Sequence, residues 1–70
     1  MRPRRYLVIV SGRLSDHCCE VFEDLCVEPD GANTGLTGEL DQAALYGVLD
    51  RIQVHGLDLL ALIRLEDAPG

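Results

Sequence analysis

The chain has 70 residues, enough for one small domain and too few for two, since domains usually span about 50 to 250 residues. Apolar residues make up 47% and charged residues 26% of the sequence, a balance typical of globular rather than disordered proteins. Six arginines stand against twelve acids, and the net charge of −6 argues against nucleic acid as a partner, because phosphate binding needs a basic face.

The sequence also argues against a membrane segment. The longest uninterrupted apolar stretches, 6–10 and 59–63, are far shorter than the roughly 20 residues that span a bilayer. The first of them follows a basic start but is shorter than the apolar part of a signal peptide. Three cysteines, an odd number, do not suggest a disulfide framework. We therefore expect a cytoplasmic protein with reduced thiols.

The first half of the chain predicts a strand, a helix and two further strands. Residues 1–5 form a basic, flexible terminus, and the β-branched residues 6–10 predict a strand that extends at most to Leu14. Ser15 is a suitable N-cap for a helix of about ten residues. A brief strand over 25–28, ended by Pro29, a turn over 30–33 and a strand over 34–40 follow. The helix is predicted from the helical spacing of Cys18, Cys19, Phe22, Leu25 and Cys26.

The second half predicts a helix and a final strand. Asp41 caps the helix, and Leu40 is placed to pack on Leu45. Gly56 stands where a left-handed residue ends a helix, and Leu57 after it can pack back on the last turn. Gly47 inside the helix is expected to permit close approach to the sheet, and residues 59–65 predict the last strand. The apolar face of the helix consists of Leu45, Val48, Leu49 and Ile52.

The order strand, helix, strand, strand, helix, strand predicts an α+β fold. Residues 6–66 then form a single ferredoxin-like βαββαβ sandwich, in which a four-stranded antiparallel sheet carries both helices on one face, and 67–70 form a flexible C-terminus. The alternative is an irregular first half that packs on the second helix with only three strands.

Two helices cover one face of such a sheet and leave the other face open. Strand alternation indicates that an apolar set on the first and last strands faces solvent: Leu7, Ile9, Leu60 and Leu62. Such a patch usually marks an interface, and a domain of this size is marginally stable alone. We therefore expect a homodimer, or docking to a larger protein, with Tyr46 as a further contact residue. The alternative is a monomer with an apolar open face.

His17, Cys18 and Cys19 carry the side chains that zinc and copper prefer. Adjacent cysteines on a helix diverge by about 100°, so they do not readily face one ion. Cys26 is two turns further along the same predicted helix. We therefore favour core packing of the cysteines and keep a metal or thiol site as the alternative.

Other candidate sites carry weaker signals. Gly12, Arg13 and Ser15 offer backbone N–H groups and one positive charge to an anion at the start of the first helix. His55 is placed to cap the second helix. No nucleophile has a base and an orienting acid at a recognisable spacing, so we expect neither an enzyme nor a bound cofactor.

The segment 12–15, Phe22, the segment 36–52 (LTGELDQAALYGVLDRI) and Gly56-Leu57 resemble small stand-alone ferredoxin-like proteins of GC-rich bacteria. This resemblance implies the fold and a bacterial cytoplasmic origin. Residues 46–63 also resemble the helix–strand half of amino-acid-sensing ACT domains. The leading hypothesis is a non-enzymatic interaction or regulatory module that self-associates. The alternatives are small-molecule sensing near 12–15 and thiol or metal binding by Cys18 and Cys19.

Overall fold

Strands and helices alternate along the chain in the predicted order. The elements are β1 (Arg4–Val10), α1 (Asp16–Val21), β2 (Cys26–Asp30), β3 (Asn33–Leu40), α2 (Gln42–Val54) and β4 (Leu59–Leu65). The computed structural model describes residues 3–65, apart from the side chains of His17 and Cys18. The terminal segments that we expected to be flexible lie partly outside this range.

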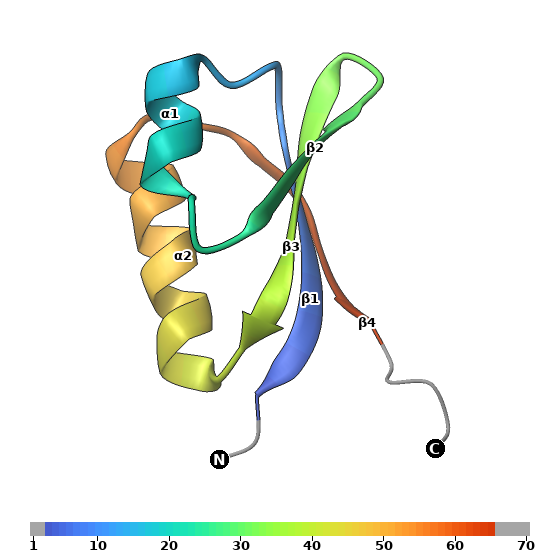
Figure 1. Ribbon diagram of the computed structural model, residues 1–70, viewed down its shortest axis with the longest axis vertical. Helices are drawn as coiled ribbons and strands as arrows, with labels where there is room; N and C mark the ends of the chain where they lie inside the picture. The colour runs from blue at the N-terminus through green and yellow to red at the C-terminus, as the bar shows by residue number, and fades with distance from the viewer. Residues whose placement is uncertain (1–2, 66–70) are drawn as a thin grey trace.

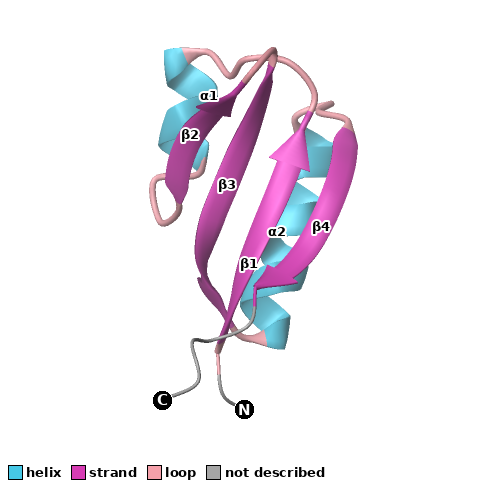
Figure 2. Ribbon diagram, turned by 90° about the vertical axis from the view of Figure 1, so that its right-hand side faces the viewer, coloured by secondary structure: helices cyan, strands magenta, loops and turns pink. Residues whose placement is uncertain are grey.

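The four strands form one antiparallel sheet in the order β2-β3-β1-β4. Both helices lie on the same side of it, so the sheet is covered on one face and open on the other (Figure 1). Figure 2 looks onto the open face and shows α2 behind β1 and β4. The predicted α+β class and four-stranded antiparallel sheet are confirmed, and the three-stranded alternative is wrong.

The core lies between the two central strands and the helices. Val8 and Val10 of β1 are buried, whereas Leu7 and Ile9 between them are only half-buried, as the strand alternation predicts. Apolar burial of this kind is the main favourable term in folding. The buried apolar side chains are Val8, Val10, Phe22, Leu25, Leu36, Leu40, Leu45, Val48 and Ile52.

Both ends of α2 have the predicted caps. The Asp41 carboxylate accepts a hydrogen bond from the Ala44 amide at 2.7 Å. At the other end Gly56 has φ +70°, and its amide donates to the Gln53 carbonyl while the Leu57 amide donates to that of Ile52. These two bonds are those of a Schellman motif, which satisfies carbonyls that the helix leaves without partners. His55 is the C-cap residue through its backbone N–H rather than its imidazole.

The first helix is shorter than predicted. It ends at Val21, and Phe22 and Leu25 reach the core from the turn that follows. The amide of Leu25 donates to the Phe22 carbonyl, which tightens this turn and lets β2 begin at Cys26. Cys26 is therefore on a strand and exposed, not on a helix and in the core. Apolar spacing alone did not separate the helix from the turn.

Two strand boundaries also differ from the expectation. β1 begins at Arg4, so Arg4 and Arg5 belong to the sheet and not to a flexible terminus; they pair with Leu40 and Glu39. Pro29 lies inside β2 instead of ending it. An edge strand tolerates proline because the missing N–H is not needed on the outer side.

Gly38 of β3 and Gly47 of α2 differ in the space that surrounds them. A Cβ atom at Gly38 would lie 2.5 Å from Cδ2 of Leu25, so glycine makes room for that core side chain. A Cβ atom at Gly47 would meet nothing within 4 Å. The expectation that Gly47 permits close approach to the sheet is therefore wrong, since this residue faces open space.

We expect Gly47→Ala to stabilise the protein and Gly38→Ala to destabilise it. Alanine at Gly47 gains helix propensity of about 0.5–1 kcal/mol without a clash. Alanine at Gly38 displaces Leu25 and costs about 1–3 kcal/mol. Urea unfolding of both variants measures the difference, and a loss of stability in Gly47→Ala would show that the space beside α2 is filled.

Candidate interaction surface

The pairing of β4 with β1 decides which side chains share a face. Leu7 lies opposite Ile63 and Ile9 opposite Ala61, whereas the buried Val8 lies opposite Leu62. Directly opposed residues of an antiparallel pair point to the same side. Leu62 therefore lies on the helix side of the sheet, and the expectation that Leu60 and Leu62 share the open face with Leu7 and Ile9 is wrong. The alternation expected along β4 holds from Ala61 to Leu65, where the register assigns its two sets to the other faces. At Leu60 the register shifts, so Leu59 lies opposite the buried Val10 and does not share a face with Ala61.

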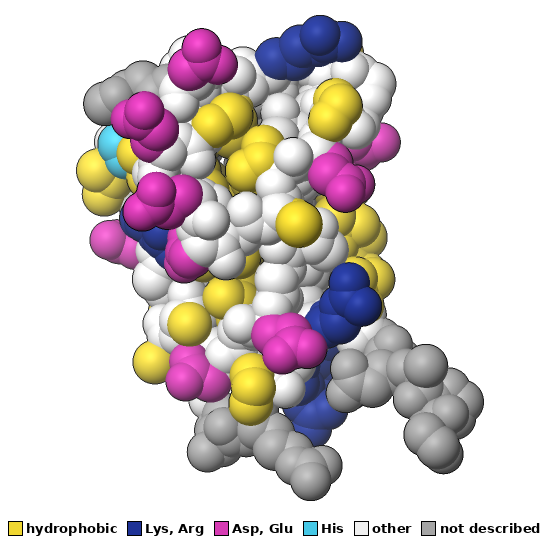
Figure 3. Space-filling model, in the orientation of Figure 1, with side chains coloured by type: hydrophobic (Ala, Val, Ile, Leu, Met, Phe, Trp, Pro, Cys, Tyr) yellow, Lys and Arg dark blue, Asp and Glu magenta, His cyan; other side chains and the backbone are white. Residues whose placement is uncertain are grey.

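Every exposed large apolar side chain of the described residues lies on β4 or α2. Leu62 is exposed although it lies on the helix side, because β4 is an edge strand that α2 covers incompletely. Figure 3, which shows the sheet edge-on, has hydrophobic side chains along the margin away from the helices as well as on the helix side. The set, each member 41% to 71% exposed, is Tyr46, Val54, Leu59, Leu60, Leu62 and Ile63.

Tyr46 lies on the flank of α2 that faces away from α1. Arg51 marks the opposite flank, because its guanidinium contacts α1. Tyr46 is about 140° from Arg51 around the helix, and its hydroxyl accepts a hydrogen bond from Gln42 at 3.1 Å. Val54 lies about 180° from the buried Leu45 and so faces away from the sheet. We call β4 together with the Tyr46 flank of α2 the β4 surface.

The two edges of the sheet differ in chemistry. The β2 edge is five residues long and carries Glu28, Pro29 and Asp30. The β4 edge is seven residues long, contains no proline and no acid, and has Arg64 as its one charged residue. Charges, prolines and short length are the features by which edge strands avoid pairing with other chains. β2 has all three of them, whereas β4 has the single charge and a register shift at Leu60, which the pairing with β1 skips.

The open face beside β2 has a shallow hollow of about 200 Å³. It lies between Leu7, Gly35 and Thr37 on one side and the residues of β2, including Glu28 and Asp30, on the other. A Cβ atom at Gly35 would lie 3.4 Å from Leu7, so glycine lets Leu7 lie flat over β3. Leu7 and Ile9 are half-buried in this way and add less exposed area than β4 does.

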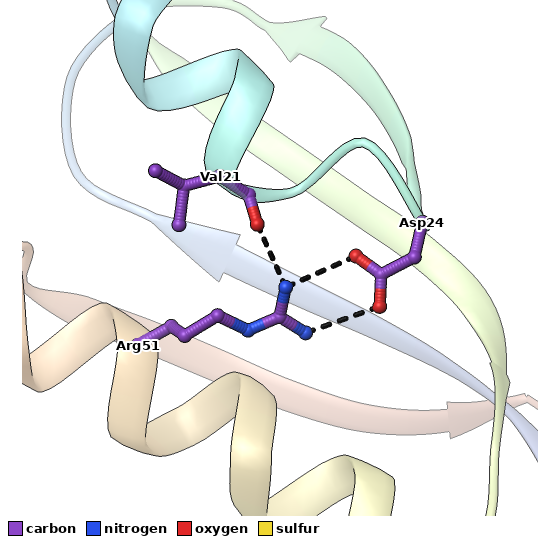
Figure 4. A network of polar contacts seen from close by, with 3 residues as sticks. All are labelled: Val21, Asp24 and Arg51. Atoms are coloured by element: carbon purple, nitrogen blue, oxygen red, sulfur yellow. Dashed lines mark hydrogen bonds and ion pairs between the residues drawn. The ribbon is translucent and has the colours of Figure 1, made fainter.

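An arginine that the sequence gave no reason to single out joins the two helices. Arg51 of α2 donates to the Val21 carbonyl at 2.7 Å and to both carboxylate oxygens of Asp24 at 3.1 Å (Figure 4). Its guanidinium also lies 5.4 Å from the centre of the Phe22 ring, a cation–π geometry. Arg51 thereby caps the end of α1 from a different helix. The hydrogen bonds from Arg51 hold the pKa of Asp24 below its ordinary value, although desolvation acts in the opposite direction.

One donor of the predicted anion site at 12–15, the Gly12 amide, is used within the protein itself. The Gly12 amide donates to Asn33 Oδ1 at 3.2 Å, and the Gly12 carbonyl accepts from the Thr34 hydroxyl at 2.8 Å. The Ser15 carbonyl accepts the first helical hydrogen bond, from Cys19. Arg13 lines a hollow whose other walls are mainly apolar. These bonds tie the loop to the β2–β3 hairpin, which gives the loop a structural role.

The two thiols that the structure describes, those of Cys19 and Cys26, lie on different sides of the sheet. The side chains of His17 and Cys18 lie outside the described residues. Cys19 is half-buried on the helix side, whereas Cys26 lies opposite Thr37 on the open side of the sheet. Within residues 3–65, with those two side chains left aside, no three His, Cys, Asp or Glu residues are grouped to hold a metal ion.

We expect the Arg51–Asp24 pair to stabilise the fold at neutral pH and not in acid. Because the pKa of Asp24 is lowered from 3.8, its contribution is complete well above pH 4 and is lost as the pH falls through the folded-state pKa. Asp24→Asn should cost about 0.5–1 kcal/mol at pH 7, since the pair is partly exposed. Urea unfolding of the wild type and the variant from pH 7 to pH 3 measures this cost. The same difference in unfolding free energy at pH 7 and at pH 3 would contradict the prediction.

None of the described helices is long and apolar enough to cross a membrane.

Searches of curated proteins and of solved structures returned no match to the chain. A protein-family model, described as Domain of unknown function (DUF8691), matches residues 5–63. The match begins within β1 and ends within β4, so it covers both helices and all or most of every strand. The chain therefore belongs to the DUF8691 family.

Proposed function

We propose that the protein is a non-enzymatic interaction module that self-associates through the β4 surface, in an accessory or regulatory role. The observation that carries the proposal is the location of the exposed large apolar side chains. All six of those found among the described residues lie on β4 and α2, and five of them belong to the β4 surface. An exposed apolar patch on one side of a small domain usually marks a contact with another protein.

The size of the domain supports the same proposal. A chain of about 60–70 residues buries only about 60% of its unfolded surface and has little stability to spare. Among the described residues, nine apolar side chains are buried, and none of them belongs to β4. A second protein that covered β4 would bury the apolar side chains of this strand as well.

We also propose that the fold is of the ferredoxin-like type. The strand order β2-β3-β1-β4, the antiparallel pairing of all neighbours and the two helices on one face support this assignment. A cytoplasmic location in a bacterium stays a prediction from the sequence.

A lysine at Leu62 should abolish self-association. Lysine on an edge strand is a common natural block to pairing, and at Leu62 it would place a charge in the apolar contact. The dissociation constant should rise on the order of 100-fold, measured by native mass spectrometry over a range of concentrations. Circular dichroism establishes that the variant is folded.

The control is Val54→Lys, which adds the same charge at an exposed apolar residue outside the β4 surface. This variant should keep the mass of the wild type. A wild-type protein that is monomeric at millimolar concentration, or a folded Leu62→Lys variant that associates like the wild type, would contradict the proposed function.

A further inference from the structure

We propose that the partner at the β4 surface is a second copy of this chain, paired β4 to β4 in antiparallel orientation across a two-fold axis. This inference rests on the proposed function and specifies its partner and geometry. The result is an eight-stranded sheet that runs from the β2 edge of one protomer to the β2 edge of the other.

The backbone of β4 is the first argument. β4 pairs with β1 on one side and has no strand on its other side. In an antiparallel pair, alternate residues direct their N–H and C=O groups toward the neighbour, so the remaining groups of β4 point outward. From Ala61 to Leu65, where the register with β1 is regular, these groups form a template for another strand. At Leu60 the register with β1 shifts and the ladder is locally irregular. Neither proline nor acid lies in the strand.

The apolar side chains of β4 are the second argument. A two-fold axis perpendicular to the sheet carries each face of one protomer onto the same face of the other. In the register that brings Arg64 of one protomer to Asp58 of the other, Ala61 lies at the axis and faces its own copy, next to Ile9 of each β1. Leu62 of each protomer then lies across from Leu60 of the other. Edge pairing therefore covers both apolar sets, whereas stacking of two open faces would leave Leu62 and Tyr46 exposed.

Charge is the third argument, and it favours a second copy over an unrelated partner. The chain carries a net charge of −6, yet β1 and β4 contain no acid, so two copies can approach there without opposing carboxylates. Arg64 lies near one end of β4, and Asp58 immediately precedes the other end; both are exposed. Antiparallel pairing places Arg64 of each protomer at the end that carries Asp58 of the other. The charges at the two ends of β4 are thus complementary to those of a second, antiparallel copy of the strand.

The β2 edge explains why the assembly closes at two copies. Pairing of β4 with β2 would join molecules head to tail and build an open fibre. Glu28 and Asp30 leave β2 charged, and Pro29 has no N–H to donate to a further strand. Association is thereby confined to the one edge that can pair with itself.

Hydrogen exchange tests the strand pairing directly. At a protein concentration well above the dissociation constant, the outward amides of β4 should exchange at least tenfold more slowly than in dilute, monomeric protein. The outward amides of β2 serve as the control in the same spectra and should exchange equally fast at both concentrations. The folded Leu62→Lys variant supplies the monomer reference if dilution does not separate the dimer.

Charge reversal tests the antiparallel direction. Arg64→Asp and Asp58→Arg should each raise the dissociation constant about tenfold or more, because each places two like-charged pairs in the dimer. The double variant restores both pairs with reversed sign and should regain most of the affinity. Both positions are exposed, so the variants should fold like the wild type.

The outcomes separate this inference from the proposed function. A dimer whose outward β4 amides exchange as in the monomer would overturn the β4 pairing and leave self-association standing. Protection of those amides without rescue by the double variant would overturn the antiparallel contact of Arg64 with Asp58. A protein that stays monomeric at every concentration would overturn both proposals.

Discussion

The packing of α2 against the two central strands is the interaction on which the rest of the molecule depends. Val48 and Ile52 of α2 lie in the same buried cluster as Val8 and Val10 of β1 and Leu36 of β3. This contact fixes the helix over the middle of the sheet, where it buries the most apolar area. The same packing leaves β4 only partly covered, since α2 lies behind β1 and β4 but does not bury the large apolar side chains of β4 (Figure 2). The exposed edge is a consequence of the same packing that stabilises the centre.

Polar contacts hold the remaining parts to this centre. Arg51 joins α2 to the end of α1, a helix of six residues that would be too short to persist alone. The loop before α1 is held in the same way, through Asn33 and Thr34 of the β2–β3 hairpin. Both contacts use groups that a sequence motif would assign to ligand binding or to solvent. Here they serve the fold.

The two edges of the sheet differ in their ability to pair with another strand. One edge is short, acidic and interrupted by proline, and the other is long and apolar on both sides. In a monomeric protein both edge strands are normally blocked from pairing, because an unprotected edge strand promotes aggregation. The asymmetry is therefore best understood if the unprotected edge is covered in the working protein. A symmetric pair is the smallest assembly that covers it and ends there.

The sequence by itself determined the elements whose signals are local. The Asp41 cap, the apolar spacing of α2 and Gly56 all lie within a few residues of what they specify, so α2 and its ends were predictable. Strand alternation likewise showed which residues share a face between Ala61 and Leu65, but not beyond the register shift at Leu60. It did not show which face, because that depends on the register with β1, which places Leu62 opposite Val8. The Arg51–Asp24 pair and the end of α1 were also decided only by the tertiary structure, since the two residues are 27 positions apart and local spacing carries no information about such contacts.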